Sequence, residues 1–342
     1  MRVRPIALLA VFIPCVIASM LPALARAADI DQFDDKIMIR PFVQYPISQL
    51  QIRNYDNSLD AVSSDTLTNL TTYQPNVNFN VGLGVGYKWF GLSYQMAVTG
   101  TARDEADYGR SEYIDFQFYF VFKKFGVDLF FQRYSGYYLV NPIRLDNPQD
   151  YNVTKGDAHV KRSDLKLTSI GLNGYYIFND NFSFKAAFKQ TERQNTSAGS
   201  FMLMASAINY GIEAEHSLIP PSQEVFYGEN AGFSRGMFTA LCVLPGYAYT
   251  FVFPNHVFIT PAGFIGAGGM IKNYHVTSGD KGETDFCWKF NVRIGAGYNG
   301  DTYFYGITAM YDRTDSQGFV SKGGISVAVA VGQIEAYAGV RF

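Results

Sequence analysis

Cysteine is scarce in this sequence: its 342 residues contain three, Cys15, Cys242 and Cys287. Such a small number cannot build a disulfide framework, so the fold must be held by backbone hydrogen bonds and packing. Beyond the amino-terminal segment no stretch approaches 18 consecutive apolar residues, which excludes a membrane-spanning helix there. Basic residues are not in excess either, because 28 Lys and Arg face 30 Asp and Glu. We therefore expect no nucleic-acid partner.

The amino-terminal segment has the pattern of a secretory signal peptide. Arg2 and Arg4 precede an apolar stretch, which ends in the small-x-small cleavage site Ala25-Arg26-Ala27. A membrane anchor is the alternative, but the apolar stretch is shorter than about 20 residues and a cleavage site follows it. We predict that residues 1–27 are removed and that 28–342 form one domain. Because three Arg and no acidic residue are lost, the net charge then changes from −2 to −5.

Aromatic residues are abundant, with 29 Phe and 24 Tyr against 13 Pro. They favour strands, and in membrane barrels they form girdles at both interfaces. Residues 76–87 alternate Val, Phe, Leu and Tyr with Asn and Gly, and residues 286–299 alternate in the same way. A soluble sandwich could also bury one such face, but its strands are seldom this long or this aromatic at both ends. The pattern favours an all-β fold, a transmembrane antiparallel up-and-down β-barrel.

The spacing of turns predicts the number of strands. Five short turns are expected at 88–90, 123–125, 179–181, 254–255 and 299–301. Six longer connections alternate with them, at 53–73, 102–110, 139–163, 194–234, 275–284 and 315–323. This arrangement gives about twelve strands with both chain ends on the short-turn side. It matches the asymmetry of outer-membrane barrels, which have short periplasmic turns and long external loops.

One segment does not fit this count. Residues 199–213 resemble a strand, yet they lie inside the fourth long connection. They could pair with residues 223–227 and raise the total to fourteen strands, or they could fold over or into the barrel mouth. We favour twelve.

Two local patterns predict the pairing of the last strands. Asn299-Gly300 suits a type I′ hairpin turn, which would place Val292 opposite Ile307. The apolar phase of the last strand shifts near Gly332-Gln333. A β-bulge is the simplest explanation, since a bulge inverts the facing of later residues, and an additional turn is the alternative.

The chain ends on a strand with an aromatic carboxy-terminus. Residues 337–342 alternate and stop at Phe342. This ending resembles that of bacterial outer-membrane barrels, where the last residue is part of the assembly signal. It implies the outer membrane of a Gram-negative bacterium, insertion by the barrel-assembly machinery through Phe342, and contact with outer-membrane lipids. Alternation places Phe342 and Val340 toward lipid, and Arg341 and Tyr337 toward the lumen.

Several motifs together resemble a domain-of-unknown-function family of predicted bacterial outer-membrane β-barrel proteins. They are Phe33-Asp34-Asp35-Lys36-Ile37-Met38-Ile39-Arg40-Pro41, Tyr73-Gln74-Pro75-Asn76, the glycine-rich run 82–91, and Gln190-Thr191-Glu192-Arg193-Gln194 with 197–201. The resemblance covers nearly all of the mature chain, from about Asp31 to Phe342. It implies the fold and the location, and it carries no activity to any residue.

Charged residues on the strands supply the candidate functional positions. A Lys or Arg facing lipid at mid-membrane costs about 2–4 kcal/mol, so charges between apolar neighbours are expected to face the lumen. The lumen-lining candidates are Asp115, Asp128, Lys185, Lys189, Lys289 and Arg293. Such a set could select solutes in a narrow or gated pore, or its opposite charges could pair and fill the barrel. A structural or surface-interaction barrel acting through loops 53–73 and 139–163 is the alternative function.

The sequence offers little for catalysis or for a cofactor. The four histidines, His159, His216, His256 and His275, are not at metal-ligand spacing to one another or to cysteine, so neither a metal nor another cofactor is predicted. Thr277 and Ser278 follow His275 closely, as a membrane hydrolase would require, but no oxyanion motif accompanies them. We therefore do not expect an enzyme.

Overall fold

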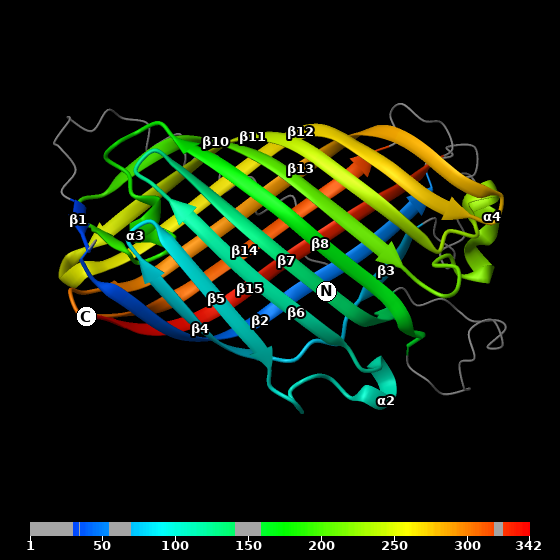
Figure 1. The fold of residues 1–342 in the computed structure, drawn as a ribbon, viewed down its shortest axis with the longest axis horizontal. Coiled ribbons are helices and arrows are strands. Elements are labelled where there is room, and N and C mark those ends of the chain that lie inside the picture. Colours follow the sequence, from blue (N-terminus) through cyan, green and yellow to red (C-terminus); the bar gives the residue numbers. More distant parts are fainter. Residues whose placement is uncertain (1–29, 34, 55–69, 141–158, 318–323) are drawn as a thin grey trace, which may run out of the picture.

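The computed structural model describes residues 30–33, 35–54, 70–140, 159–317 and 324–342, so the predicted leader lies outside the described residues. Antiparallel strands that run obliquely along the barrel form a closed ring (Figure 1). Pairing of β2 with β15 and of β6 with β7 closes the ring. The fold is an outer-membrane-type β-barrel, and the prediction of about twelve strands is confirmed. No helix in the described part of the chain is long and apolar enough to span a membrane.

The wall strands are β2 (Ile37–Asn54), β4 (Asn80–Tyr87), β5 (Phe90–Ala97), β6 (Glu112–Val121), β7 (Phe125–Leu139), β8 (Lys161–Ile177), β10 (Ala198–Glu213), β11 (Arg235–Phe253), β12 (Val257–Val276), β13 (Gly279–Asn299), β14 (Tyr303–Gln317) and β15 (Ile325–Arg341). Three short strands accompany them: β1 (Ile30–Gln32), β3 (Leu70–Gln74) and β9 (Glu192–Gln194). The helical segments are α2 (Glu105–Tyr108), α3 (Phe184–Phe188), η3 (Pro221–Gln223), α4 (Glu224–Tyr227), η4 (Gly228–Asn230) and η5 (Pro254–His256). We call the end that holds the carboxy-terminus the terminal end, and the opposite end, near α4, the distal end (Figure 1).

The ring is narrower at its distal end. There β3 pairs with both β2 and β7. The shorter strands β4, β5 and β6 lie between β2 and β7 nearer the terminal end. Since β3 alone replaces three strands, the distal opening is the smaller one.

The strand count was correct although two segments were assigned wrongly. Residues 181–194, predicted as a wall strand, contain α3 and β9 instead. Residues 199–213 belong to β10, which pairs with β8 and β11 along its length. All five residues of α3 are buried, so this segment has no apolar alternation to distinguish inside from outside. Ser183 caps the helix by accepting a hydrogen bond from the amide of Ala186.

The predicted register of the β13–β14 hairpin was wrong. Asn299 pairs with Phe304, and Val292 therefore lies opposite Tyr311 rather than Ile307. Neither Asn299 nor Gly300 is among the described residues with positive φ, so the type I′ turn does not form. Arg341 donates to the carbonyl of Gly300 and to the side chain of Asn299, which fixes a longer connection. The shift is an even number of residues, so the inward and outward faces are as predicted.

The predicted β-bulge at Gly332 was also wrong, because β15 pairs with β14 and with β2 without interruption on both sides of Gly332. The apolar phase nevertheless inverts. Distal to Gly332, Val327 and Val329 face inward into a buried core. On β2 the same change occurs, since Ile47 faces outward whereas Leu50 faces inward.

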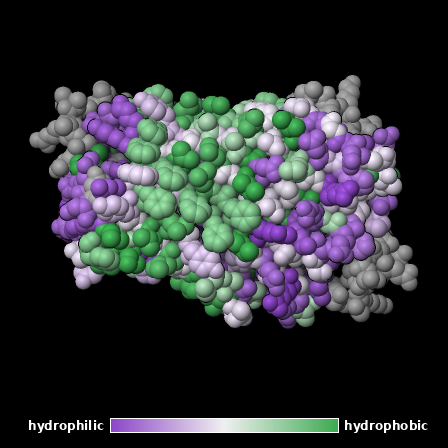
Figure 2. All heavy atoms as spheres, in the orientation of Figure 1, coloured by the Kyte–Doolittle hydropathy of each residue, from purple (hydrophilic) through white to green (hydrophobic). Residues whose placement is uncertain are grey.

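This inversion marks the edge of the membrane. In the membrane the outside of the barrel must be apolar, whereas strands that extend beyond it must be polar outside and apolar inside, as in a soluble sheet. Arg313, outward on the distal part of β14, accordingly bonds to Gln51 (2.7 Å) and Asp315 (3.0 Å). Figure 2 shows a broad apolar band with hydrophilic surface toward both ends. We call the water-facing distal part of the wall the collar.

Segments of the chain fill both ends of the ring. At the distal end, residues 214–234, which we call the cap, bury Leu218, Phe226 and Phe233 in the core beneath the collar. Tyr227 donates a hydrogen bond to the carbonyl of Ile52 (2.8 Å).

At the terminal end, β1, α3 and β9 form what we call the plug. The Arg341 guanidinium lies between two rings, 4.2 Å from the centroid of Phe33 and 4.3 Å from that of Phe304. Arg193 pairs with Asp31 and Asp301. Burial alone would raise the pKa of Asp31, but hydrogen bonds from Asn195 and Arg193 outweigh it and hold that pKa below its usual value.

The position of the apolar band can be tested on one strand. Val43 lies outward near the middle of the band and Gln49 lies outward in the collar, both on β2. Val43→Lys should lower the free energy of unfolding in lipid vesicles by about 2–4 kcal/mol, whereas Gln49→Lys should lower it by about 0–1 kcal/mol. Urea unfolding of the two variants measures the difference. Equal losses would place the membrane edge elsewhere.

Candidate functional site: the polar lumen

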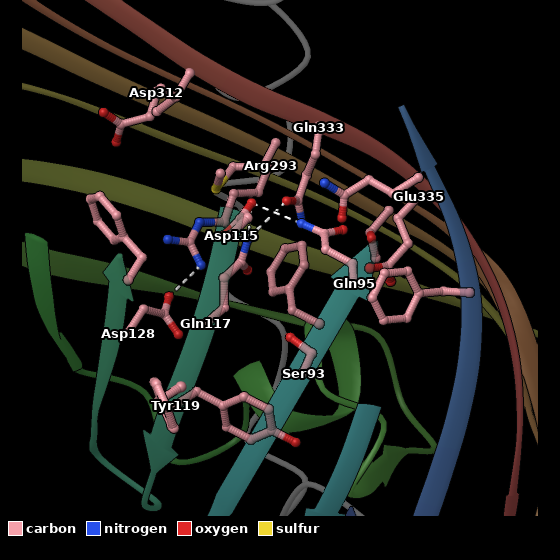
Figure 3. Close-up of a pocket in the computed structure, with 18 of the residues that line it drawn as sticks. Ser93, Gln95, Asp115, Gln117, Tyr119, Asp128, Arg293, Asp312, Gln333 and Glu335 are labelled. Carbon is pink, nitrogen blue, oxygen red and sulfur yellow. Dashed lines mark hydrogen bonds and ion pairs between the residues drawn. The ribbon is translucent and has the colours of Figure 1, made fainter. Parts of the chain in front are cut away.

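A polar cavity of about 110 Å³ lies inside the membrane part of the barrel, bordered by α3 at its terminal side. Its wall combines side chains from β2, β5, β6, β7, β8, β13, β14 and β15 with Lys189, which follows α3. Figure 3 shows these side chains converging on one space from several strands. Inward residues of neighbouring strands meet here because side chains alternate between the two faces of the wall.

One wall of the cavity carries two cations around one carboxylate. Arg293 Nη1 lies 2.9 Å from the carboxylate of Asp128 (Figure 3). Lys189 Nζ lies 3.1 Å from the same carboxylate. Lys189 also lies 4.2 Å from the ring centroid of Tyr119. The structure thus brings together three of the residues predicted to line the lumen, although Lys189 comes from the plug and not from a strand.

The charged contacts continue along β13 and β14. Arg293 Nε donates to Asn291 (2.9 Å), and Asn291 donates to Asp312 (2.8 Å). Lys289 pairs with the same carboxylate and donates to Thr314 (3.2 Å). Lys289 is fully buried. Each charge in this row therefore has an opposite charge or an amide beside it, as burial in a low dielectric requires.

A second part of the cavity wall is built around Asp115, which lies on β6 beside β7 and is 2% exposed. Its carboxylate accepts hydrogen bonds from Gln95 on β5 (2.8 Å), Gln132 on β7 (3.0 Å) and Gln117 (3.3 Å). Among the described residues its donors are all amides, and none is a cation. Gln117 also donates to Gln333 on β15 (3.1 Å). This bond connects the Asp115 wall to the seam of the barrel, where the first wall strand, β2, pairs with the last, β15.

Lys185, the remaining predicted candidate, lies away from the central cavity. It pairs with Glu192 in the plug (2.6 Å), and Ser183 donates to the same carboxylate (2.6 Å). A second hollow, of about 170 Å³, borders these residues at the terminal end.

The predicted lumen-lining candidates omit several charged residues of the lumen, although alternation on the last strand does place Glu335 inward. Arg40 and Glu335 form an ion pair across the seam between β2 and β15 (3.1 Å). Lys272 pairs with Glu283 (2.9 Å) and Asp285 toward the distal end. These residues stand at inward positions of their strands, so alternation applied to every charge could have found them.

Two other predicted features can be placed. His275 Nδ1 lies 2.8 Å from Asp280 at the distal rim, and Thr277 and Ser278 occupy the turn that follows. The hydrolase arrangement would need a hydroxyl at that imidazole, and the described contact is with a carboxylate. The described residues contain no group of three or more His, Cys, Asp or Glu side chains that could hold a metal ion. Cys242 and Cys287 are free, buried thiols.

The row of paired charges can be tested through Lys289 and Asp312. Lys289→Met leaves the buried carboxylate of Asp312 without its cation and should lower the free energy of unfolding by about 3–5 kcal/mol. The double variant Lys289→Met/Asp312→Leu removes both charges and should recover most of that loss. Unfolding in lipid vesicles measures both. A double variant no more stable than the single one would show that the pair is not the source of the effect.

No curated protein matches this chain. Among solved structures, the outer-membrane protease OmpT of Escherichia coli is 8% identical, covering 93% of this chain and 99% of its own, with a TM-score of 0.41. OmpT of Vibrio cholerae is 9% identical, with coverages of 94% and 99% and a TM-score of 0.33. A Pseudomonas aeruginosa FadL homologue is 11% identical, with coverages of 89% and 90% and a TM-score of 0.28. These scores are too low to carry an argument about function. A family model matches residues 28–342, nearly the whole chain, and the protein belongs to that family, described as "Domain of unknown function (DUF4421)".

Proposed function

We propose that this protein is a gated conduit for small polar solutes in the outer membrane, closed at both ends in the described conformation. The observation that carries this proposal is the set of buried polar atoms in the cavity wall that have no hydrogen-bond partner in the protein. They are Arg40 Nε, Gln44 Nε2, Gln95 Oε1, Tyr119 OH, Gln132 Oε1 and Asn173 Oδ1. Buried polar groups are nearly always paired, so this wall suits water or a polar solute better than a purely structural filling.

The two closures are compatible with gating because neither belongs to the wall. Apart from β1, which precedes β2, the plug lies in the connection between β8 and β10, which pair directly with each other. The cap lies between β10 and β11, which also pair directly, from Glu213 and Arg235 onward. Either segment could therefore move without breaking a strand ladder of the wall. By the asymmetry of outer-membrane barrels, the plug faces the periplasm and the cap faces outside.

A structural or surface-interaction barrel is the second candidate. The collar favours it, because a rigid wall that extends beyond the membrane could present external loops. Within the loops assigned to that role, residues 55–69 and 141–158 lie outside the described residues. This candidate needs no solute path, so conductance distinguishes the two functions. Neither proposal assigns a catalytic step to the chain.

Conductance in planar bilayers tests the conduit. The wild-type barrel should show brief openings from a mostly closed state. A variant in which a short Gly-Ser linker replaces residues 182–196 lacks α3 and β9 and should stay open much longer. A matched variant that shortens the cap, residues 215–233, tests the other closure, and slower gel migration after heating verifies that each barrel is folded. If the wild type and the plug variant are both silent, the barrel is not a conduit and the second candidate remains.

We also infer that Phe342 engages the barrel-assembly machinery from the membrane side. Its side chain is 63% exposed at the terminal rim, while its amide and carbonyl pair with Ile37 (3.1 and 2.9 Å). Deletion of Phe342 should therefore lower the amount of inserted barrel in cells several-fold and leave refolding into detergent unchanged. Fractionation of outer membranes measures the first quantity, and a matched Tyr303→Ala change on the same rim serves as a control. Equal insertion of the deletion variant and the wild type would contradict the inference.

A further inference from the structure

Asp115 differs from the other buried carboxylates of the lumen. Asp128, Glu335 and Asp312 each have a Lys or Arg partner. Asp115 is buried as deeply, yet the described residues supply it with amide donors and no cation. A carboxylate removed from water is ordinarily neutralised by a cation. The negative charge of Asp115 is therefore left for a bound cation to neutralise.

The amides around Asp115 are oriented by it. A carboxylate only accepts hydrogen bonds, so the Nε2 atoms of Gln95 and Gln132 must point at Asp115 and their Oε1 atoms must point away. Both Oε1 atoms are buried and unpaired, and so is Oδ1 of Asn173 on β8. All three side chains line the cavity, and each residue is more than nine-tenths buried. This wall therefore offers one negative charge and two further acceptors, and Asn173, which pairs with Asp128 in the β7–β8 ladder, supplies a third elsewhere in the same cavity.

We propose that this set of residues, which we call the Asp115 subsite, binds the protonated amino group of a small organic solute. An ammonium group carries one positive charge and three N–H donors, which match a carboxylate and neighbouring amide oxygens. The inference rests on the proposed function, since it names the class of solute that the conduit would take.

The shape of the cavity favours an organic amine over a bare inorganic cation. Phe130, Met310 and Val331 also line the space, and they suit an apolar substituent more than a hydration shell. The cavity, at about 110 Å³, is larger than one ion needs. Elsewhere in the same cavity, Lys189 and Arg293 share the single carboxylate of Asp128, so the positive end of the solute is directed to the Asp115 wall.

Calorimetric titration of the refolded barrel in detergent with n-propylammonium chloride tests the proposal. The wild type and the plug variant should both bind one propylammonium saturably. Tetramethylammonium, which has the charge and lacks N–H donors, should bind at least tenfold more weakly, and sodium propionate should not bind. Asp115→Asn should weaken propylammonium binding at least tenfold. Glu112→Gln, which removes an exposed carboxylate from the same strand, is the matched control and should leave binding unchanged.

Three results would overturn the inference: no saturable binding of propylammonium to either protein, equal affinity in Asp115→Asn, or equal affinity for potassium chloride. The comparison between propylammonium and tetramethylammonium needs no substitution, so it holds even if Asp115→Asn fails to fold. Binding and conductance are measured separately. A barrel that conducts without binding the amine contradicts the subsite alone, and a barrel that binds without conducting contradicts the conduit alone.

Discussion

The closure of the strand ring is the constraint on which the rest of this structure depends. Inside a bilayer no water is available to bond a free N–H or C=O group, so a sheet in the membrane cannot have an edge. The first and last wall strands therefore pair over most of their length, from Ile325 with Asn54 to Arg341 with Met38. Arg341, at the end of β15, connects this seam to the plug, because its guanidinium donates hydrogen bonds to the carbonyl of Gln190. Closure and filling of the terminal end are thus coupled through one side chain.

Closure also creates an interior that the chain must fill. A ring of about twelve strands is wider than the eight-stranded barrels whose own side chains fill them. Here the two halves of the interior are filled differently. The distal half has an apolar core formed by the collar and the cap, whereas the membrane half has ion pairs, amides and a cavity. The narrower distal ring, where β3 bridges β2 and β7, makes the apolar filling smaller.

The sequence predicted well what the lipid determines. Lipid imposes an apolar outer face on every membrane strand, so alternation identified the wall, the inward charges and the facing of the last six residues. It did not predict what the interior determines. The helix α3 is buried on all sides and carries no periodic pattern. The inversion of the apolar phase on β15 resembled a bulge, because alternation does not show where a strand leaves the membrane. The β13–β14 register depends on Arg341, which is 42 positions from Asn299 along the chain.

The candidate site shows the same division. Alternation placed Asp115, Asp128 and Arg293 inward, but it could not assign the cations of Asp128, because Arg293 stands on a strand remote in sequence and Lys189 follows a helix. The Arg293–Asp128 pair, for example, joins residues 165 positions apart. The contrast between Asp128, which has two cations, and Asp115, which has amides only, exists only after the ring has closed. Two carboxylates of the same residue type, on neighbouring strands, thus acquire different chemistry: Asp115 is surrounded by amides of β5, β6 and β7, whereas Asp128 meets a cation of β13 and one of the plug. The chemistry of a barrel interior follows from closure, and sequence alternation can supply only the list of side chains that take part.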